Sequence, residues 1–228
     1  MGTMMINRGT GTSELVEVEN FDLTENISSK LQRFNPVESE PFVTETDLYK
    51  VAHEMQNNIV DELVPASRLT VEMTIALIDN EYKAVIMLSY NRDMYAFTPN
   101  SFRQICAKSG MGEVSYMKKC IANKLSYLVP QNLNAWLRTQ GDKEFLVRFY
   151  KRNVVAFLSP KYGVFDHADA LDCLNNALRK NSTYNVEAYS LDIDNMFIRL
   201  VDTDRIVAQD DSGGRDKSTV GLILRNLS

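Results

Sequence analysis

The clearest periodicity in this chain lies in the stretch FLVRFYKRNVVAFLSPKYGVFDHADALDCLNNAL, residues Phe145–Leu178. Its first six residues alternate, with the side chains of Phe145, Val147 and Phe149 expected on one face. The polar run Lys151–Asn153 follows, and then the continuous apolar run Val154–Leu158. Two β-rich runs around a short polar break are typical of a hairpin. We therefore predict a strand, a turn and a second strand here.

The second half of the stretch has the pattern of an amphipathic helix. Asp166 stands where an N-cap residue is expected, and Asp169 follows three residues later, the spacing of a capping box. One helical face then carries Ala168, Leu171, Leu174, Asn175 and Leu178. We expect this face to pack on the hairpin, so that Phe145–Leu178 forms a ββα unit.

The composition is that of an ordinary soluble protein, with 44% hydrophobic and 24% charged residues among 228. No apolar run approaches the roughly 20 residues of a membrane span, and the first twelve residues lack a signal-peptide core. We therefore predict a cytoplasmic protein that does not contact a membrane. Cys106, Cys120 and Cys173 lie among helical apolar positions, which favours buried reduced thiols.

Polar composition divides the chain into an acidic arm over residues 1–42 and a single domain over residues 43–228. At the start of that domain, Glu45–Leu63 has helical spacing, with Thr44 or Thr46 as its cap, and Pro65 ends it. Val71–Ile78 and Ala84–Tyr90 then predict a second hairpin.

The centre of the domain, Thr98–Thr139, is predicted to be a helical insert. Thr98 and Pro99 form a helix start, and Gly110 ends that first helix. After the ββα unit, strand-like runs at 185–190, 195–201 and 219–224 are expected to extend the sheet. The fold class is therefore α+β, with a mixed or antiparallel sheet, the helical insert and the ββα unit.

Charge is segregated along the sequence. Residues 1–65 hold twelve acidic and four basic residues, whereas residues 101–160 hold ten basic and three acidic ones. A basic centre is suited to a nucleic-acid or acidic-protein partner. Ordinary solvated helix faces are the alternative explanation.

Basic and aromatic residues alternate in the sequence around the predicted hairpin turn and on the predicted helices. Such surfaces bind single-stranded nucleic acid through base stacking and phosphate contacts. The candidate nucleic-acid contacts are Arg148, Tyr150, Lys151, Arg152, Lys118, Lys119 and Arg103. Ser109–Gly112 also fits the turn of a helix-turn-helix, which would place Lys118 and Lys119 on the second helix, although a simple helical hairpin has the same pattern.

Signs of catalysis are weak. His53 and His167 are the only histidines, and neither lies in a nucleophile motif; no phosphate-binding glycine motif occurs either. Asp166, Asp169 and Asp172 could hold Mg²⁺ with His167, but stabilisation of a helix N-terminus explains acids at these positions equally well. Because the helix N-terminus is the simpler explanation of these acids, we predict no catalytic residues, no metal and no cofactor.

Three segments resemble the phage- and plasmid-encoded domain-of-unknown-function family 932: FTPNSFRQICAKSGMGEVSYMKKC at Phe97–Cys120, the run Asn132–Leu174, and VGLILRN at Val220–Asn226. The likeness extends from about Ala84 to the C-terminus. It implies an origin in a mobile element, beside recombination and single-strand-binding genes, and supplies no catalytic residues. Family members continue beyond the last segment, so this chain is expected to be a short member.

These observations predict a phage or mobile-element accessory protein that binds nucleic acid, single-stranded DNA in particular, without catalysis. The alternative is a protein-binding phage factor that inhibits a host defence complex, with the acidic front as a mimic of nucleic acid. A metal-dependent nuclease is the third possibility.

Overall fold

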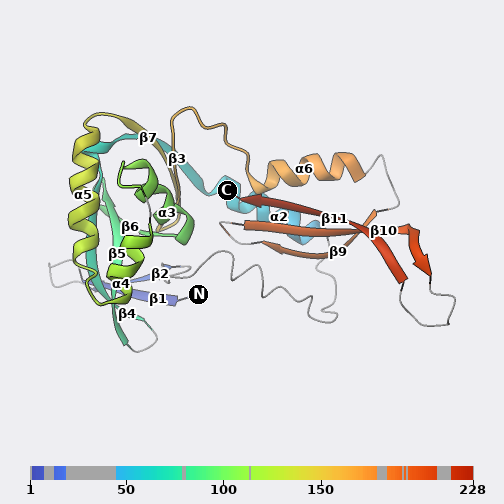
Figure 1. Ribbon diagram of the computed structural model, residues 1–228, viewed down its shortest axis with the longest axis horizontal. Helices are drawn as coiled ribbons and strands as arrows, with labels where there is room; N and C mark the ends of the chain where they lie inside the picture. Colours follow the sequence, from blue (N-terminus) through green and yellow to red (C-terminus); the bar gives the residue numbers. More distant parts are fainter. Residues whose placement is uncertain are drawn as a thin grey trace. The chain divides into compact units, whose positions relative to one another are not determined.

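The predicted hairpin forms two inner strands of a six-stranded sheet, β7 (Glu144–Tyr150) and β8 (Asn153–Leu158) (Figure 1). The strand order is β3-β7-β8-β6-β5-β4. Neighbouring strands are antiparallel except for β6 and β8, which pair in parallel. The predicted α+β class with a mixed sheet is therefore confirmed.

The computed structural model describes residues 2–7, 13–18, 45–78, 81–112, 114–178, 184–191, 193, 195–209 and 217–227. The chain divides into two compact units. Unit 1 comprises Met1–Phe34 and Asn58–Gly163, and unit 2 comprises Asn35–Asn57 and Val164–Ser228. The prediction from sequence was a single domain over residues 43–228.

The remaining strands of the large sheet are β3 (Ile59–Pro65), β4 (Thr70–Ile78), β5 (Glu81–Tyr90) and β6 (Asp93–Phe97). Strands β4 and β5 are the predicted second hairpin, with Thr70 opposite Ser89 and Ile78 opposite Glu81. Asp79 and Asn80, which we expected in its turn, lie outside the described residues.

Strand β3 corrects the sequence prediction of one helix over Glu45–Leu63. The helix α2 (Glu45–Asn57) stops at Asn57, and Ile59–Pro65 is instead a strand paired along its whole length with β7. The apolar spacing of Ile59 and Leu63 fits a helix, but β-branched residues at 59 and 60 also suit a strand. Long-range pairing with β7 decides between the two structures. The proposed cap Thr44 lies outside the described residues.

The sheet curls on itself because its two edge strands are close in sequence. β3 ends at Pro65 and β4 begins at Thr70, and the link contains the short 3-10 helix η1 (Ala66–Arg68). Residues 66–69 can span at most about 14 Å when fully extended, so β3 and β4 must approach each other. A hydrogen bond of 2.8 Å from the Tyr90 hydroxyl on β5 to the Glu62 carboxylate on β3 also joins the two sides.

The predicted helical insert forms α3 (Pro99–Lys108), α4 (Ser115–Ala122) and α5 (Leu128–Gln140), which pack against the sheet (Figure 1). As expected, Thr98 caps α3, and its hydroxyl accepts a hydrogen bond from the Ser101 amide at 3.2 Å. Pro130 lies in the first turn of α5, where a missing N–H costs no helical hydrogen bond.

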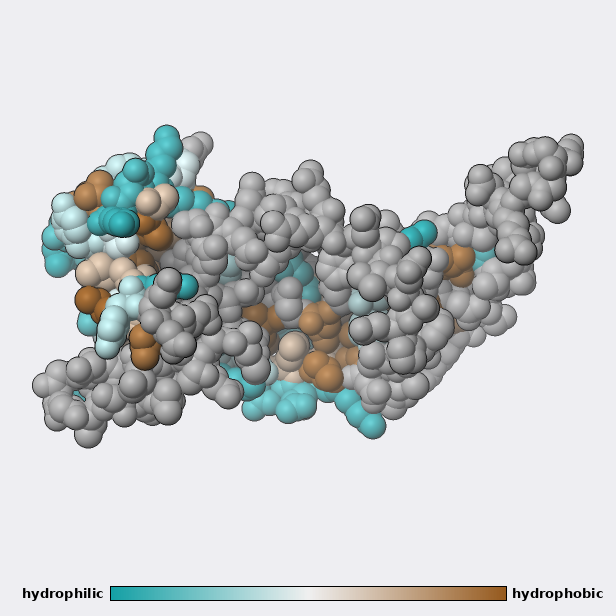
Figure 2. Space-filling model, turned by 90° about the horizontal axis from the view of Figure 1, so that it is seen from below, coloured by the Kyte–Doolittle hydropathy of each residue, from teal (hydrophilic) through white to brown (hydrophobic). Residues whose placement is uncertain are grey.

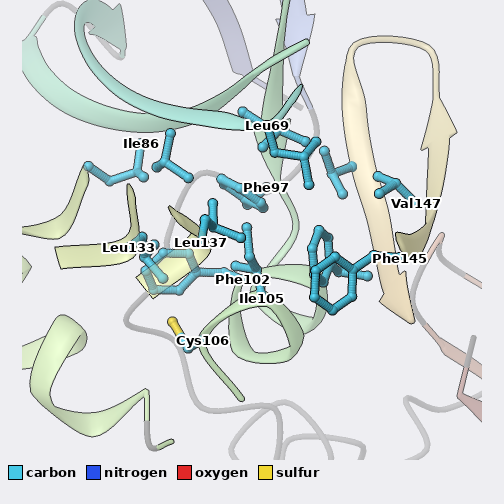
Figure 3. Close-up of a cluster of buried hydrophobic side chains, with 14 of the residues drawn as sticks. Leu69, Ile86, Phe97, Phe102, Ile105, Cys106, Leu133, Leu137, Phe145 and Val147 are labelled. Carbon is cyan, nitrogen blue, oxygen red and sulfur yellow. The ribbon is translucent and has the colours of Figure 1, made fainter. Parts of the chain in front are cut away.

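The core of unit 1 lies between these helices and the sheet (Figure 3). Phe97 and Phe102 meet edge to face with their ring centroids 5.8 Å apart, and the rings of Phe145 and Phe157 lie 4.7 Å apart. Leu133 and Leu137 of α5 are fully buried in the same cluster. These buried contacts fix α3 and α5 on the sheet, so the exposed faces of the two helices also have defined positions.

Unit 2 contains α2, α6 (His167–Leu178) and an antiparallel sheet of β9 (Tyr184–Leu191), β10 (Asn195–Gln209) and β11 (Lys217–Leu227). The apolar face of α6 packs here: Ala168 and Leu171 share a core with Leu48 of α2 and Ile198 of β10. The predicted packing of this helix on the hairpin is therefore wrong, and Phe145–Leu178 is not one ββα packing unit. The C-terminal strands form their own sheet and do not extend the large one.

The predicted arm over residues 1–42 is described only at β1 (Gly2–Asn7) and β2 (Ser13–Val18). These strands pair as an antiparallel hairpin, and β1 contacts β4. The other residues of the arm lie outside the described part of the chain.

Candidate nucleic-acid interface

Two of the predicted nucleic-acid contacts, Arg148 and Tyr150, are buried. The two residues are 3% and 7% exposed on β7, respectively. The Arg148 Nε donates to the Asp61 carboxylate on β3 at 2.7 Å, so this guanidinium is part of the contact between two strands. We had expected an exposed Arg148 on the hairpin, but its side chain is buried and its charge is satisfied by Asp61.

Lys151 and Arg152 do form the turn between β7 and β8. Lys151 is exposed, with its Nζ 5.0 Å from the centroid of the Tyr150 ring. Arg152 is half-buried, and its Nη1 donates to Asp93 at 2.6 Å. The aromatic ring and the carboxylate thus hold both cations in place beside the next turn of the sheet.

That next turn carries one cation that the sequence analysis missed, Arg92, and binds a second, Arg68. Asn91 and Arg92 connect β5 to β6, and both are exposed. The Arg68 guanidinium, on η1, donates from Nη2 to the Asn91 side-chain oxygen at 2.7 Å and lies 5.4 Å from the centroid of the Tyr90 ring. We call Arg68, Arg92, Lys151 and Arg152 the hairpin-turn cluster. Because Arg68 and Arg92 are far from 151–152 in sequence, only the pairing of β6 with β8 reveals this cluster.

The other three predicted contacts lie on helices. Arg103 is exposed on α3, where its Nη2 donates to Asn100 at 2.7 Å. Lys118 is half-buried and Lys119 is exposed on α4. Successive helical residues are rotated by about 100°, so these two lysines lie on different sides of α4. They do not form a joint basic stripe.

Exposed aromatic rings accompany Lys119 on one side of the helices. Tyr116 of α4 is 51% exposed, Tyr127 just before α5 is 50% exposed, and Trp136 of α5 is 42% exposed. Lys124, in the connection between the helices, is also exposed. We call Tyr116, Lys119, Lys124, Tyr127 and Trp136 the aromatic patch. At the left-hand end of Figure 2, where Figure 1 places α4 and α5, hydrophilic (teal), near-neutral (pale) and hydrophobic (brown) residues are mixed at the surface.

Tyr116 has close polar neighbours on both helices. A side-chain hydrogen bond with Cys120 is the main reason that the pKa of Tyr116 is raised; the nearby Cys120 and Tyr127 groups add to the rise, and a hydrogen bond with Asn132 opposes it. Asn132 lies one helical turn before Trp136, which is a rise of about 6 Å along α5. Tyr116 therefore lies beside the first part of α5, near Asn132 and Tyr127, and Trp136 follows Asn132 one turn later on the same side of the helix.

Trp136 is held by the connection that we compared with a helix-turn-helix turn. A Cβ placed on Gly110 would lie 3.5 Å from the indole of Trp136, and Gly110 has a φ of 96°. The Gln140 amide donates to the Ser109 carbonyl at 2.9 Å. The turn after α3 is thus packed against α5, and this packing fixes the position of the exposed indole.

Lys124 ends α4 in a conformation that favours glycine. Its φ is 60°, the Leu125 amide donates to the Cys120 carbonyl at 2.8 Å, and the Lys124 amide donates to the Ile121 carbonyl at 3.1 Å. This is the pattern of a Schellman motif with lysine at the left-handed position. Left-handed backbone costs a residue with a Cβ about 1 kcal/mol, so this lysine is held at the surface at some cost in stability.

No acidic residue occurs between residues 114 and 141, whereas Lys118, Lys119, Lys124 and Arg138 all lie there. The segment that carries the aromatic patch therefore has a positive net charge, and no carboxylate within this segment competes with a bound anion. The patch can accept flat rings by stacking and anionic groups at its lysines.

The acidic series of α6, which we weighed as a Mg²⁺ site, has structural partners in unit 2. The Asp169 carboxylate accepts from the Asp166 amide at 2.9 Å, as a capping box requires. Asp172 accepts from the Tyr49 hydroxyl of α2 at 2.8 Å, and the His53 Nε2 lies 3.9 Å from the same oxygen. In the part of the chain that the structure describes, no three His, Cys, Asp or Glu side chains are placed to hold a metal ion.

The cysteines differ in exposure, which corrects the expectation of three buried thiols. Cys106 and Cys120 are buried, but Cys173 on α6 is exposed, and none is in a disulfide. Burial raises the pKa of the Cys106 thiol to about 12.

Thiol labelling is therefore expected to proceed in two steps. In the native protein, Cys173 alone should react with a maleimide within minutes, because the thiolate is the reactive form and Cys106 is both buried and protonated. Peptide mass mapping after short and long exposure measures the order of labelling. Equal rates at Cys106 and Cys173 in folded protein would contradict this description of the core.

None of the described helices combines the length and the apolar character that crossing a bilayer requires. Comparison with protein-family models, curated proteins and solved structures found no match. The resemblance to family 932 stays a prediction.

Proposed function

We propose that this protein binds single-stranded nucleic acid, DNA in particular, through the aromatic patch and without catalysis. The observation that carries the proposal is the presence of three exposed aromatic rings with Lys119 and Lys124 in a helical segment that contains no acidic residue. A place in the DNA metabolism of a mobile element is also proposed, and it rests on the resemblance to family 932.

Stacking supplies the sequence-independent part of the binding energy. Every base has a flat face, and a base stacked on an aromatic side chain contributes about 1–3 kcal/mol. The lysines contribute phosphate contacts, which weaken as salt rises because bound counterions are released. Paired bases in a duplex do not offer these faces, so we expect a preference for single strands.

The duplex-reading alternative has less support from the geometry. α4 is only eight residues long, and Lys118 is half-buried and lies on the opposite side of the helix from Tyr116. A recognition helix would need a row of polar side chains directed away from the domain. The most exposed feature near α4 is instead aromatic.

The test uses the single tryptophan of the chain, Trp136, as a reporter in the patch. Adding oligothymidine at low salt should quench its emission, because a stacked base contacts the indole directly, and labelled oligonucleotide should show a parallel rise in anisotropy. Double replacement Tyr116→Ala/Tyr127→Ala should weaken binding by about tenfold or more for each ring that stacks a base. Tyr82→Ala is the matched control, since this ring is 80% exposed on β5.

Lys124→Gly separates binding from folding. Glycine removes the charge and relieves the left-handed backbone, so the free energy of unfolding should rise by up to about 1 kcal/mol while affinity for oligothymidine falls. Opposite changes cannot come from misfolding. Absence of both quenching and anisotropy change for the unaltered protein at low salt would refute the proposal, and a nuclease-resistant complex with one protein partner would then favour the protein-binding alternative.

A further inference from the structure

The hairpin-turn cluster is built from two turns that the sheet places side by side. β6 and β8 are parallel neighbours, with Ala96 opposite Asn153, so the turns that precede these two strands lie at the same end. The Ala96 amide donates to the Arg152 carbonyl at 2.9 Å, in addition to the contact between Arg152 and Asp93. The cations in these turns therefore lie close together on a rigid part of the sheet.

Three residues in the two turns have left-handed backbone: φ is 51° at Asn91, 70° at Arg92 and 52° at Lys151. Asparagine tolerates this conformation, whereas arginine and lysine are unfavourable there compared with glycine. Such strain clusters at functional sites, where the side chain serves a purpose other than stability. Two of these three residues, Arg92 and Lys151, present exposed cations.

The acidic residues nearest to the cluster already have partners. Asp93 accepts from Arg152, and Glu62 accepts from the Tyr90 hydroxyl at 2.8 Å. Arg152 is therefore a positioning residue that ties the two turns together. The exposed cations of the cluster are Arg68, Arg92 and Lys151.

Helix α5 separates this cluster from the aromatic patch. The Asn134 side-chain oxygen accepts a hydrogen bond from the Val71 amide on β4 at 2.7 Å, and its side-chain nitrogen donates to the Val71 carbonyl at 2.8 Å. The side of α5 that carries Asn134 therefore faces this edge of the sheet. Trp136, two residues later, is rotated by about 200° and lies against Gly110 in the turn after α3. The Ser67 amide, next to Arg68, donates to the Gly141 carbonyl at the end of α5 at 3.0 Å.

The outer face of α5 offers a path between the two sites. Its exposed residues are Gln131, Ala135, Arg138 and Thr139, one of them basic and none acidic. Arg138 is one helical turn after Asn134 and thus lies toward Arg68. Asp142, the first acidic residue after the helix, accepts from the Ser67 hydroxyl at 2.9 Å.

We propose that a single strand bound at the aromatic patch crosses the outer face of α5 and places its phosphates at Arg68, Arg92 and Lys151 of the hairpin-turn cluster. This inference rests on the proposed function and adds the path of the bound strand over unit 1, which we call the track. Bases stack on the aromatic patch at one end of the track, and the hairpin-turn cluster contacts only phosphates at the other end.

The test compares oligothymidines of two lengths. One has about four nucleotides, which is within the length that a small single-strand-binding module covers, and the other has about 20, which is beyond it. Double replacement Arg92→Gly/Lys151→Gly removes two charges at positions whose backbone favours glycine, so the fold should not lose stability. For the long oligonucleotide, the slope of log affinity against log salt should become shallower by about 1.4, about 0.7 for each phosphate contact on a single strand. Binding of the short oligonucleotide should be unchanged.

Lys83→Ala/Lys161→Ala is the matched control. Both lysines are exposed in unit 1, near the ends of β5 and β8 that lie away from the two turns, and the charge change is the same. The proposed track would be wrong if the control variant changed the salt slope as much as the glycine variant did, or if the glycine variant did not change the slope. In either case, quenching of Trp136 would still support binding at the aromatic patch. Failure of the unaltered protein to bind either length would instead refute the proposed function.

Discussion

Replacing Phe102 with alanine is expected to lower the free energy of unfolding by about 3–5 kcal/mol. Phe102 is completely buried on α3, and its ring meets Phe97 edge to face beneath the sheet (Figure 3). The substitution removes buried apolar surface and leaves a cavity that the surrounding β-strands cannot close, because close-packed cores relax only in part. Denaturant unfolding followed through Trp136, which belongs to the same unit, measures the loss.

Arg103→Ala provides the comparison for Phe102→Ala. It changes the next residue of the same helix, but at an exposed position, so its effect should stay within about 0.5 kcal/mol. A loss below about 1 kcal/mol for Phe102→Ala would show that α3 is not packed on the sheet in the way described above.

Removing Asp61 is expected to destabilise the protein more than removing Arg148, although the two form one ion pair. The Arg148 side chain is 4% exposed and the Asp61 side chain 34%. Asp61→Ala takes the carboxylate away from a buried guanidinium, and breaking a buried pair in this way costs about 3 kcal/mol. Arg148→Met leaves a carboxylate that water can reach and keeps an apolar stem of similar length, so about 1 kcal/mol is expected.

Both variants should bind oligothymidine with the affinity of the unaltered protein under conditions where they are folded, because the pair lies between β3 and β7. Equal losses of stability would mean that Arg148 is as accessible to water as Asp61. Weaker binding by folded Arg148→Met would indicate that Arg148 contacts phosphate, as the sequence predicted.

The local elements of this protein were predictable from neighbouring residues. The alternation in Phe145–Leu158 and the caps Thr98 and Asp166 are interactions within a few positions, and the structure contains the hairpin and both helix starts. The basic centre and its aromatic residues are also visible in the sequence, and Tyr116, Lys119 and Tyr127 keep exposed positions.

Pairing between distant segments decided the rest. Ile59–Leu63 has helical spacing but becomes a strand because β7 supplies hydrogen bonds along its length, and the face of α6 packs on α2 and β10 because those elements form a second core. Arg148 was predicted at the surface because it belongs to a run in which basic and aromatic residues are interleaved, yet Asp61 on the adjacent strand satisfies its charge. The hairpin-turn cluster has the same origin: the parallel pairing of β6 with β8 brings Arg92 near Lys151 and Arg152, and the hydrogen bond to Asn91 brings Arg68 to the same turn. The sequence by itself thus determined most of the elements and the overall distribution of charge. The tertiary structure alone decided which of these charges are exposed side by side, because burial and proximity depend on contacts between residues far apart in the chain.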